Sequence, residues 1–358
     1  MDVFDGHNDL PWRLRIRYPS GSFADLAQDL GGTGLHTDLP RLERGGVGAQ
    51  FWSVYVPNDR PEPQAAIQVV EQVELVRRIV ARYPDRLAIA TNAAEVEQAR
   101  ATGRIASLLG AEGGHCLDNS LVVLGSLYKL GIRYLTLTHS RNTAWADSAT
   151  DTPAVGGLSD FGREVVRELN RLGMLADLSH VADSTMHAVL DVSTAPAFFS
   201  HSSARALCGH PRNVPDDVLQ RVRETNGVVM VTFVPFFLTE ECRSWGDELY
   251  RVEDAIALPW DSPEFLDHRQ RWIDANPCPP TTAADVADHI DHVREVAGVD
   301  AVGLGGDFDG TEVVPGDLPD VSAYPALFAE LSSRGWTDAD LRKLAWDNAM
   351  RVLRVTCG

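Results

Sequence analysis

The sequence predicts an α/β protein whose strands close into a single (β/α)8 TIM-type barrel. Eight short apolar runs are spread over the 358 residues, and segments with helical periodicity separate them. Most runs are nearly continuous in apolar residues, which is typical of parallel strands covered on both faces. Eight alternating units over this length favour the barrel, with a doubly wound sheet as the alternative. The predicted strands cover residues 3–4, 50–56, 105–109, 134–138, 174–178, 196–199, 228–233 and 301–304.

Three helices are predicted with defined ends. Apolar residues at three- and four-residue steps predict one over 158–172, and Gly173 supplies its C-cap. A second begins after Thr282 and stops at Gly298. The carboxy-terminal helix is predicted over 337–355, because it opens with a sequence close to a capping box.

The segment 238–280 follows the seventh predicted strand and is too long for a simple connection. It is rich in Trp, Asp, Glu and Pro, so we expect an excursion with a helix of its own over the barrel mouth. No linker divides the chain elsewhere, and residues 1–358 are therefore expected to form one domain.

Composition excludes several classes of partner. A formal net charge of −19 argues against nucleic acid and against anionic membrane surfaces. No stretch approaches about 18 consecutive apolar residues, and no secretory leader is recognised, so a cytoplasmic location without membrane contact is expected. The five cysteines are scattered without a C-x-x-C pair, which excludes a zinc ribbon and a dense disulfide scaffold.

Polar side chains stand at the ends of most predicted strands. His7 and Asp9 close the first run, and because side chains alternate along a strand, the two point the same way. In a barrel, all strand ends of this kind meet at the carboxyl face. A single histidine there is usually a hydrogen-bonding residue, but the set suits two cations that share a carboxylate, and we favour zinc. The strand-end set is His7, Asp9, Glu112, His139, Asp177, His180, His201 and Asp307.

Longer motifs surround these residues. They are DGHNDLPW at 5–12, EGGH at 112–115, LTLTH at 135–139, FSHSSA at 199–204, RNVPDD at 212–217 and GGDFDG at 305–310. With them the chain resembles the renal (membrane) dipeptidase family, metallopeptidases of the amidohydrolase superfamily. The resemblance covers essentially the whole chain, and without a recognised leader or lipid anchor it is closest to a soluble bacterial-type member.

The resemblance implies a binuclear metal centre with two Zn²⁺ per chain. By position, His7 and Asp9 bind one ion, His180 and His201 bind the other, and Glu112 bridges both. A carboxylate has two oxygens and can span a metal pair, which agrees with the role of Glu112. The implied reaction is attack of a metal-bridging hydroxide on the amide carbonyl of a dipeptide.

The resemblance also implies roles for five further residues. His139 hydrogen-bonds the developing oxyanion, and Asp307 takes a proton from the nucleophile and delivers it to the leaving amine. Arg212 binds the terminal carboxylate of the substrate in a bidentate manner through its guanidinium group. Asn142 and Trp12 are expected to wall the pocket and bind substrate.

Two of these assignments have alternatives. Arg212 precedes two aspartates at 216–217. The alternative to substrate binding is therefore an ion pair between Arg212 and these aspartates within the loop. Asp309 competes with Asp307 because it faces the same side two residues on; the position nearer the strand body is the better candidate.

Four residues are assigned outside the site. His289 and His292 lie one helical turn apart among aspartates, and we expect a solvated acidic face there. Cys208 falls where the family can carry a disulfide and Cys242 is its plausible partner, although a reducing cytoplasm favours free thiols.

The predicted function is a zinc-dependent dipeptidase, and the family accepts some substrates with a D-residue at the carboxy end. Another hydrolase of the superfamily (a β-lactam or lactone hydrolase, or a deaminase) is the alternative enzyme. A non-catalytic metal-dependent binding protein is the third hypothesis. Arg212 discriminates between the enzymes, since a neutral substrate gives it nothing to bind, and the presence of Asp307 favours catalysis. A homodimer is expected from the family.

Overall fold

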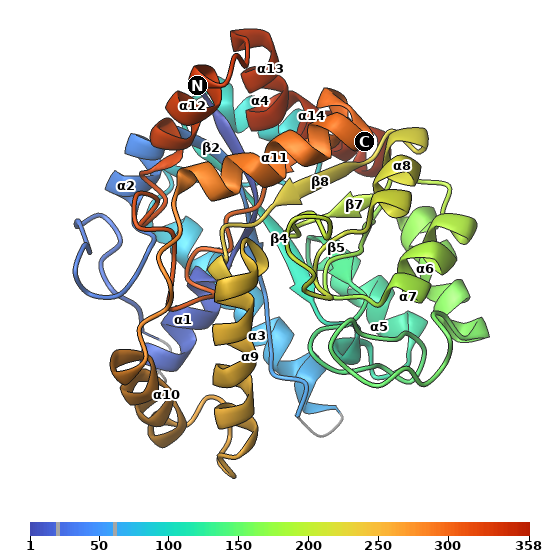
Figure 1. Ribbon diagram of the computed structural model, residues 1–358. Coiled ribbons are helices and arrows are strands. Elements are labelled where there is room, and N and C mark those ends of the chain that lie inside the picture. Colours follow the sequence, from blue (N-terminus) through green and yellow to red (C-terminus); the bar gives the residue numbers. More distant parts are fainter. Residues whose placement is uncertain (19–21, 60–62) are drawn as a thin grey trace.

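A closed parallel barrel forms the centre of the computed structural model, which describes residues 1–18, 22–59 and 63–358 (Figure 1). Eight strands follow one another in the order β2-β1-β9-β8-β7-β6-β5-β4, and β4 pairs back onto β2. All pairings between these strands are parallel, so the predicted (β/α)8 fold is confirmed. The strands are Val3–Asn8 (β1), Val47–Ser53 (β2), Leu87–Ile89 (β3), Ile105–Glu112 (β4), Ile132–Thr136 (β5), Leu175–Asp177 (β6), Phe198–Phe199 (β7), Val228–Val231 (β8) and Val302–Leu304 (β9).

One strand escaped prediction. The short β3 pairs with β4 outside the closed ring. Its three residues run from buried to exposed, so no apolar run or clean alternation marks them in the sequence.

Helices surround the barrel, and their predicted ends are largely confirmed. Gly173 ends α6 with a left-handed φ of 75°, and a capping box at Thr282 opens α11. The α-helices are Leu10–Arg17 (α1), Leu39–Gly45 (α2), Gln64–Arg82 (α3), Ala93–Ala101 (α4), Leu121–Lys129 (α5), Asp160–Leu172 (α6), Asp183–Val192 (α7), Asp216–Glu224 (α8), Glu240–Asp254 (α9), Pro263–Ala275 (α10), Ala283–Ala297 (α11), Tyr324–Ser333 (α12), Asp338–Arg342 (α13) and Asn348–Cys357 (α14). Within the described residues, none is long and apolar enough to cross a membrane.

The carboxy-terminal helix differs from the prediction of one regular helix over 337–355. It consists of α13, a π-helical turn at Lys343–Asp347, and α14. Three consecutive residues of the π turn are buried. A regular α-helix spreads three consecutive side chains over more than half its circumference, and the wider turn brings them toward one side.

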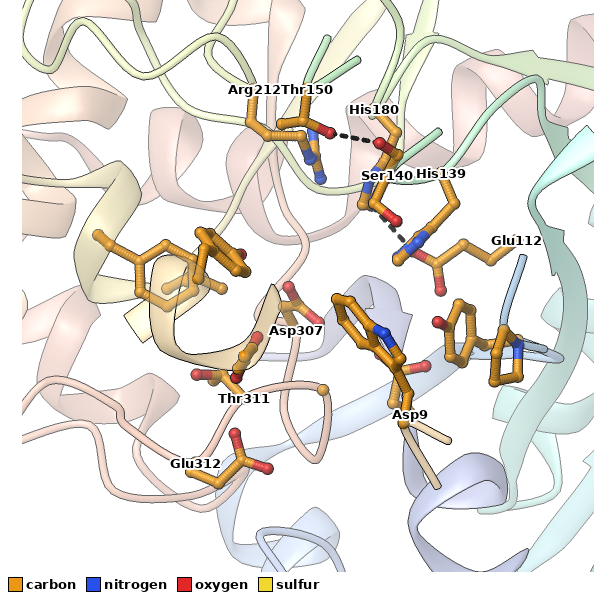
Figure 2. Close-up of a pocket in the computed structure, with 18 of the residues that line it drawn as sticks. Asp9, Glu112, His139, Ser140, Thr150, His180, Arg212, Asp307, Thr311 and Glu312 are labelled. Carbon is orange, nitrogen blue, oxygen red and sulfur yellow. Dashed lines mark hydrogen bonds and ion pairs between the residues drawn. The ribbon is translucent and has the colours of Figure 1, made fainter. Parts of the chain in front are cut away.

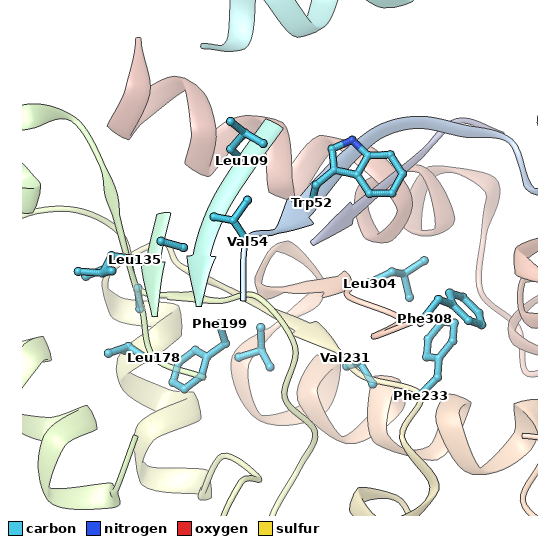
Figure 3. Close-up of a cluster of buried hydrophobic side chains, with 14 of the residues drawn as sticks. Trp52, Val54, Leu109, Leu135, Leu178, Phe199, Val231, Phe233, Leu304 and Phe308 are labelled. Atoms are coloured by element: carbon cyan, nitrogen blue, oxygen red, sulfur yellow. The ribbon is translucent and has the colours of Figure 1, made fainter. Parts of the chain in front are cut away.

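The strands divide their side chains between two apolar clusters. Phe51 of β2 points into the barrel, where the Tyr134 ring of β5 lies 4.9 Å from it. The next residue, Trp52, points outward into the cluster between barrel and helices (Figure 3). This alternation is the period of two expected of a strand. The Tyr134 hydroxyl lies 2.9 Å from Nδ1 of His7, toward the end of β1.

Gly110 of β4 makes room for the Tyr134 ring. A Cβ atom at this position would lie 1.9 Å from Cζ of Tyr134. We expect Gly110→Ala to lower the free energy of unfolding by about 1–3 kcal/mol, as overpacking of a dense core does. Denaturant unfolding measures the change, with Gly125→Ala as the control, because a Cβ at Gly125 meets open space on helix α5. Equal midpoints for the two variants would contradict the tight packing of the ring.

The excursion between β8 and α11 lies at the end of the molecule away from both termini (Figure 1). It contains two helices, α9 and α10, where the sequence predicted one. An ion-pair chain ties them to the barrel. Arg269 Nε lies 2.6 Å from Glu253 and its Nη1 lies 2.9 Å from Glu312, which also pairs with Arg13 of α1 at 3.1 Å. The excursion is thereby held beside the loop that follows β9.

Candidate active site

A cavity of about 810 Å³ opens at the carboxyl ends of the barrel strands. Figure 2 shows that its labelled residues come from several strand ends far apart in sequence, among them Asp9, Glu112, His180 and Asp307. Helices α9 and α10 supply one wall through Tyr250, Phe265 and Arg269, among others. The cavity is therefore built jointly by the barrel and the excursion.

The strand-end residues meet in two pairs. Nε2 of His7 lies 3.1 Å from Oδ2 of Asp9, at the end of β1. Nε2 of His180, which follows β6, lies 2.9 Å from Nε2 of His201, which follows β7. Each pair therefore directs its ligand atoms at a common point.

Glu112 at the end of β4 stands between the two pairs. Its Oε2 lies 3.4 Å from Nε2 of His7, and its Oε1 lies 3.0 Å from Nε2 of His180 and 3.5 Å from Nε2 of His201. Ser53 donates a hydrogen bond of 2.8 Å to Oε2 and so fixes the rotation of the carboxylate. The two oxygens of a single carboxylate thus face different ligand pairs.

These donors fit a pair of divalent cations. Within the described residues, His7, Glu112 and His201 form one group whose ligand atoms lie within 4.8 Å of one another, and overlapping groups add Asp9, His139, His180 and Asp307. In the part of the chain that the structure describes, the buried Oδ1 of Asp9 has no hydrogen-bond partner, which leaves a carboxylate oxygen available as a ligand. Imidazole and carboxylate groups in this ratio are typical of zinc sites.

The local charges agree with this fit. Burial, reinforced by Arg212, lowers the pKa of His180 and of His201 well below the ordinary histidine value, so both rings are neutral and offer a lone pair. Burial opposes a charge on His7, but the carboxylates of Glu112 and Asp9 outweigh it and raise its pKa well above the usual value. The two carboxylates therefore favour a positive charge at this point of the site.

Strained backbone places two of the site residues. His180 has φ 70° and Asp307 has φ 60°, in the left-handed region that residues other than glycine rarely adopt. Gly310 allows the loop after β9 to close over the site. A Cβ there would lie 2.2 Å from Oδ1 of Asp307 and 2.5 Å from Oδ2 of Asp9.

Asp307 and His139 flank the ligand pairs. Oδ1 of Asp307 lies 4.0 Å from Nε2 of His7, and burial raises the pKa of this carboxyl well above its ordinary value. Nε2 of His139 lies 3.9 Å from Oε1 of Glu112, and burial lowers its pKa, so the neutral ring is available as a hydrogen-bond donor. Both side chains line the cavity.

Arg212 is a buried cation at the cavity wall. Its guanidinium donates to Ser202 Oγ and to the His201 carbonyl, both at 3.3 Å, and it stacks over the Phe237 ring. Its Nε has no hydrogen-bond partner within the described residues. The two aspartates of the alternative interpretation pair elsewhere, Asp216 with His292 and Asp217 with His187. The Nε–H group is thus available to an anion in the cavity, which Arg212 lines.

Comparison with known proteins identifies the family of this chain. The family model described as membrane dipeptidase (peptidase family M19) matches residues 1–357. The chain belongs to the membrane dipeptidase family. It is 40% identical to an uncharacterized dipeptidase of Schizosaccharomyces pombe over 99% of this chain and 80% of that protein. It is also 40% identical to Dipeptidase 3 of Mus musculus, over 98% of this chain and 64% of the mouse protein.

Solved structures agree with the family assignment. A metallopeptidase described as dipeptidase AC superposes with a TM-score of 0.82 at 28% identity, over 100% of this chain and 99% of that one. A Rhodobacter sphaeroides metallopeptidase, solved with a phosphinate mimic of the dipeptide L-Ala-D-Ala, gives 0.81 at 28% identity, with 99% of each chain covered. The predicted resemblance, the enzyme class and a metal-dependent dipeptidase function are confirmed at the level of the family.

The two residues expected to wall the dipeptidase pocket differ in their placement. Trp12 lines the cavity and packs edge-on against Tyr55, with ring centroids 5.1 Å apart. Asn142 is not part of the cavity wall. Its amide donates to the Thr152 carbonyl at 2.6 Å and accepts from the Ser148 N–H at 2.7 Å, so both ends brace the loop. We therefore do not retain Asn142 as a substrate-binding residue.

Asp309 and His289 have structural roles. Asp309 accepts from the backbone N–H of His36 at 2.9 Å, and its own N–H donates to the His36 ring at 3.0 Å, which leaves Asp307 nearer the ligand pairs. The prediction of a solvated face was wrong for His289, which is 1% exposed. Its Nδ1 accepts from the Ala204 N–H and its Nε2 donates to the Leu238 carbonyl.

The cysteine pair suggested by the resemblance is not joined. All five cysteines are free thiols. Sγ of Cys208 lies 3.7 Å from the Phe236 carbonyl, whereas the side chain of Cys242 hydrogen-bonds that of Cys278.

The sequence analysis did not identify three residues that hydrogen-bond the proposed metal ligands. Ser53, Tyr134 and Ser200 each hydrogen-bond a proposed ligand or its neighbour. Ser200 stands beside His201 in a quoted motif, and Tyr134 is an inward position of a predicted strand. Alternation along these strands was a usable signal for both.

Proposed function

We propose that this chain hydrolyses the amide bond of dipeptides with a pair of zinc ions held by His7, Asp9, Glu112, His180 and His201. One observation carries the proposal: Oε2 of Glu112 faces His7, while Oε1 faces His180 and His201. A carboxylate placed in this way is suited to bridge two cations. Two such cations lower the pKa of a water molecule and supply a nucleophile at neutral pH.

Three side chains complete the proposed chemistry. The neutral ring of His139 donates a hydrogen bond to the oxygen that becomes negative as the amide carbon turns tetrahedral. Asp307, whose raised pKa suits it to hold a proton, accepts one from the nucleophile and delivers it to the leaving amine. Arg212 pairs with the terminal carboxylate of the substrate and so sets the position of the scissile bond.

The substrate class follows from Arg212. A buried guanidinium beside the ligand pairs favours a small substrate with a free carboxylate over the neutral lactone or nucleobase substrates of the alternative hydrolases. The dipeptide mimic in the Rhodobacter sphaeroides relative supports L,D-dipeptides among the substrates. We further propose a homodimer, which sedimentation tests, and a cytoplasmic location, which the free thiols support.

Metal removal tests the proposed centre. Treatment with a chelator is expected to abolish dipeptide hydrolysis, and zinc is expected to restore it. Glu112→Gln should reduce the retained zinc from two ions per chain to fewer than one, because the bridge serves both ions. Metal analysis of the purified protein measures this.

Glu253→Gln is the matched control for that experiment. Glu253 is a buried carboxylate of the same cavity, but its ion-pair partner is Arg269. This variant should retain both ions. Activity that persists in metal-free protein, or zinc binding by Glu112→Gln equal to that of the unmodified chain, would contradict the proposed function.

A further inference from the structure

The carboxyl end of helix α9 is an acidic part of the cavity wall. Glu253 and Asp254 are the last two residues of this helix, and both line the cavity. Carboxylates are unfavourable at this end of a helix, because the aligned peptide dipoles make it the negative end. A cation bound here from the cavity would be stabilised by both carboxylates and by the end of the helix.

The carboxylate of Glu253 has an oxygen that the fold does not use. The residue is 2% exposed, and Nε of Arg269 lies 2.6 Å from its Oε1. Within the described residues, Oε2 has no hydrogen-bond partner. Arg269 is shared, since its Nη1 lies 2.9 Å from Glu312. Burial raises the pKa of Glu253 although Arg269 lowers it, so a further cation would stabilise the ionised form.

Aromatic rings line the cavity beside these carboxylates. Tyr250 precedes Asp254 by one turn of α9, and Trp260 stacks on Phe265 with ring centroids 5.7 Å apart. All three rings belong to the cavity wall. Aromatic faces attract cations, and they also cover the methylene groups of lysine and arginine side chains. Carboxylates together with aromatic rings therefore suit a long side chain that ends in a positive charge.

The place of this wall relative to Arg212 indicates which substrate residue it meets. Figure 2 shows Arg212 and Glu312 on opposite sides of Asp307. Glu312 is joined through Arg269 to the end of α9, so this acidic wall lies beyond Asp307 from Arg212. With the terminal carboxylate of a dipeptide on Arg212, the amino-terminal residue extends toward α9.

We propose that Glu253 and Asp254 select dipeptides whose amino-terminal residue is lysine or arginine, by binding the positive charge of its side chain. An acidic side chain at the same position would meet like charges and is selected against. The inference rests on the proposed function and adds the class of dipeptide to it. Both residues lie outside the proposed ligand set, so their role is substrate specificity.

Three substrates test the inference on the unmodified, zinc-loaded chain. Lysyl-alanine, norleucyl-alanine and glutamyl-alanine share the α-amino group, the amide and the carboxylate, and they differ in the charge of one side chain. We expect kcat/KM for lysyl-alanine to exceed that for norleucyl-alanine by about tenfold or more, as expected of a close charge pair. Glutamyl-alanine should be the slowest of the three.

Charge-neutralising variants assign the preference to α9. Glu253→Gln should lower the ratio of kcat/KM for lysyl-alanine to that for norleucyl-alanine, and the double variant with Asp254→Asn should abolish the preference. Glu248→Gln is the matched control, because Glu248 lies in the same helix, pairs with Arg251 and is not part of the cavity wall. This control should keep the ratio of the unmodified chain.

The outcomes separate this inference from the proposed function. Equal hydrolysis of the three substrates by the unmodified chain would overturn the inference alone, and this comparison decides even if the variants fail to fold. An unchanged ratio in the double variant, or an equal loss on all substrates in Glu253→Gln, would also overturn it. No hydrolysis of any dipeptide by the zinc-loaded chain would contradict the proposed function, and the inference would fall with it.

Discussion

Replacing Asp307 by asparagine is expected to lower kcat for dipeptides by about 10²–10⁴-fold, the usual contribution of a positioned acid or base. The variant should keep both zinc ions, because Asp307 lies 4.0 Å from His7 Nε2, farther than the members of either ligand pair lie from each other. Asparagine has the same shape and tolerates the left-handed φ of 60°. Turnover is measured on protein whose zinc content has been determined.

Asp309→Asn provides the matched control for Asp307. It lies in the same loop, also with a left-handed φ, and its carboxylate accepts from the backbone of His36, which an amide oxygen can replace. This variant should keep kcat within a few-fold. Near-normal turnover of metal-replete Asp307→Asn would remove the proton-transfer role. Loss of one zinc ion from it would make Asp307 a ligand of the His7–Asp9 ion instead.

Replacing Arg212 by methionine should lower kcat/KM for dipeptides with a free carboxylate by about 10²-fold or more. Removing one partner of a buried charge pair costs about 2–5 kcal/mol, and each 1.4 kcal/mol is tenfold. Methionine keeps much of the volume beside the Phe237 ring, so the cavity wall should persist. Arg212→Lys should recover only part of the loss, because an ammonium group lacks the planar fork.

Paired substrates test the Arg212 assignment. A C-terminally amidated dipeptide offers no carboxylate, so the difference between the free and the amidated substrate should shrink in Arg212→Met. Arg205→Met is the control, since Arg205 lies in the same loop but pairs with Asp183 at 2.7 Å. An equal loss on both substrates would mean that Arg212 supports the wall of the cavity and does not recognise the carboxylate.

Most of the barrel could be predicted from local patterns. A covered parallel strand needs an apolar run, and each ring strand has one, so all eight were found within a few residues. The strand β3 was missed because one end is exposed and it pairs with β4 alone. The π turn at Lys343–Asp347 was missed because helical periodicity does not report which bond pattern closes each turn.

The proposed ligands were also predictable, because their residue types and their place after apolar runs are visible one strand at a time. The placement of Asn142 was not. Its amide meets partners six and ten residues along the same loop, and loop conformation leaves no periodic signal. The predicted exposure of His289 was wrong for a related reason. A helix usually carries polar residues on its outer face, but α11 turns this ring inward, where it hydrogen-bonds the backbone of two distant segments.

The sequence by itself determined the fold class, the family resemblance and the identities of the strand-end histidines and carboxylates, since these depend on residue type and short-range period. Only the tertiary structure decided that Glu112 faces both ligand pairs, and that Arg212 is a buried cation whose Nε has no hydrogen-bond partner within the described residues. These arrangements depend on barrel closure, which brings together strand ends separated by up to about three hundred residues. The distances between them are set by packing across the barrel, and no local pattern encodes them.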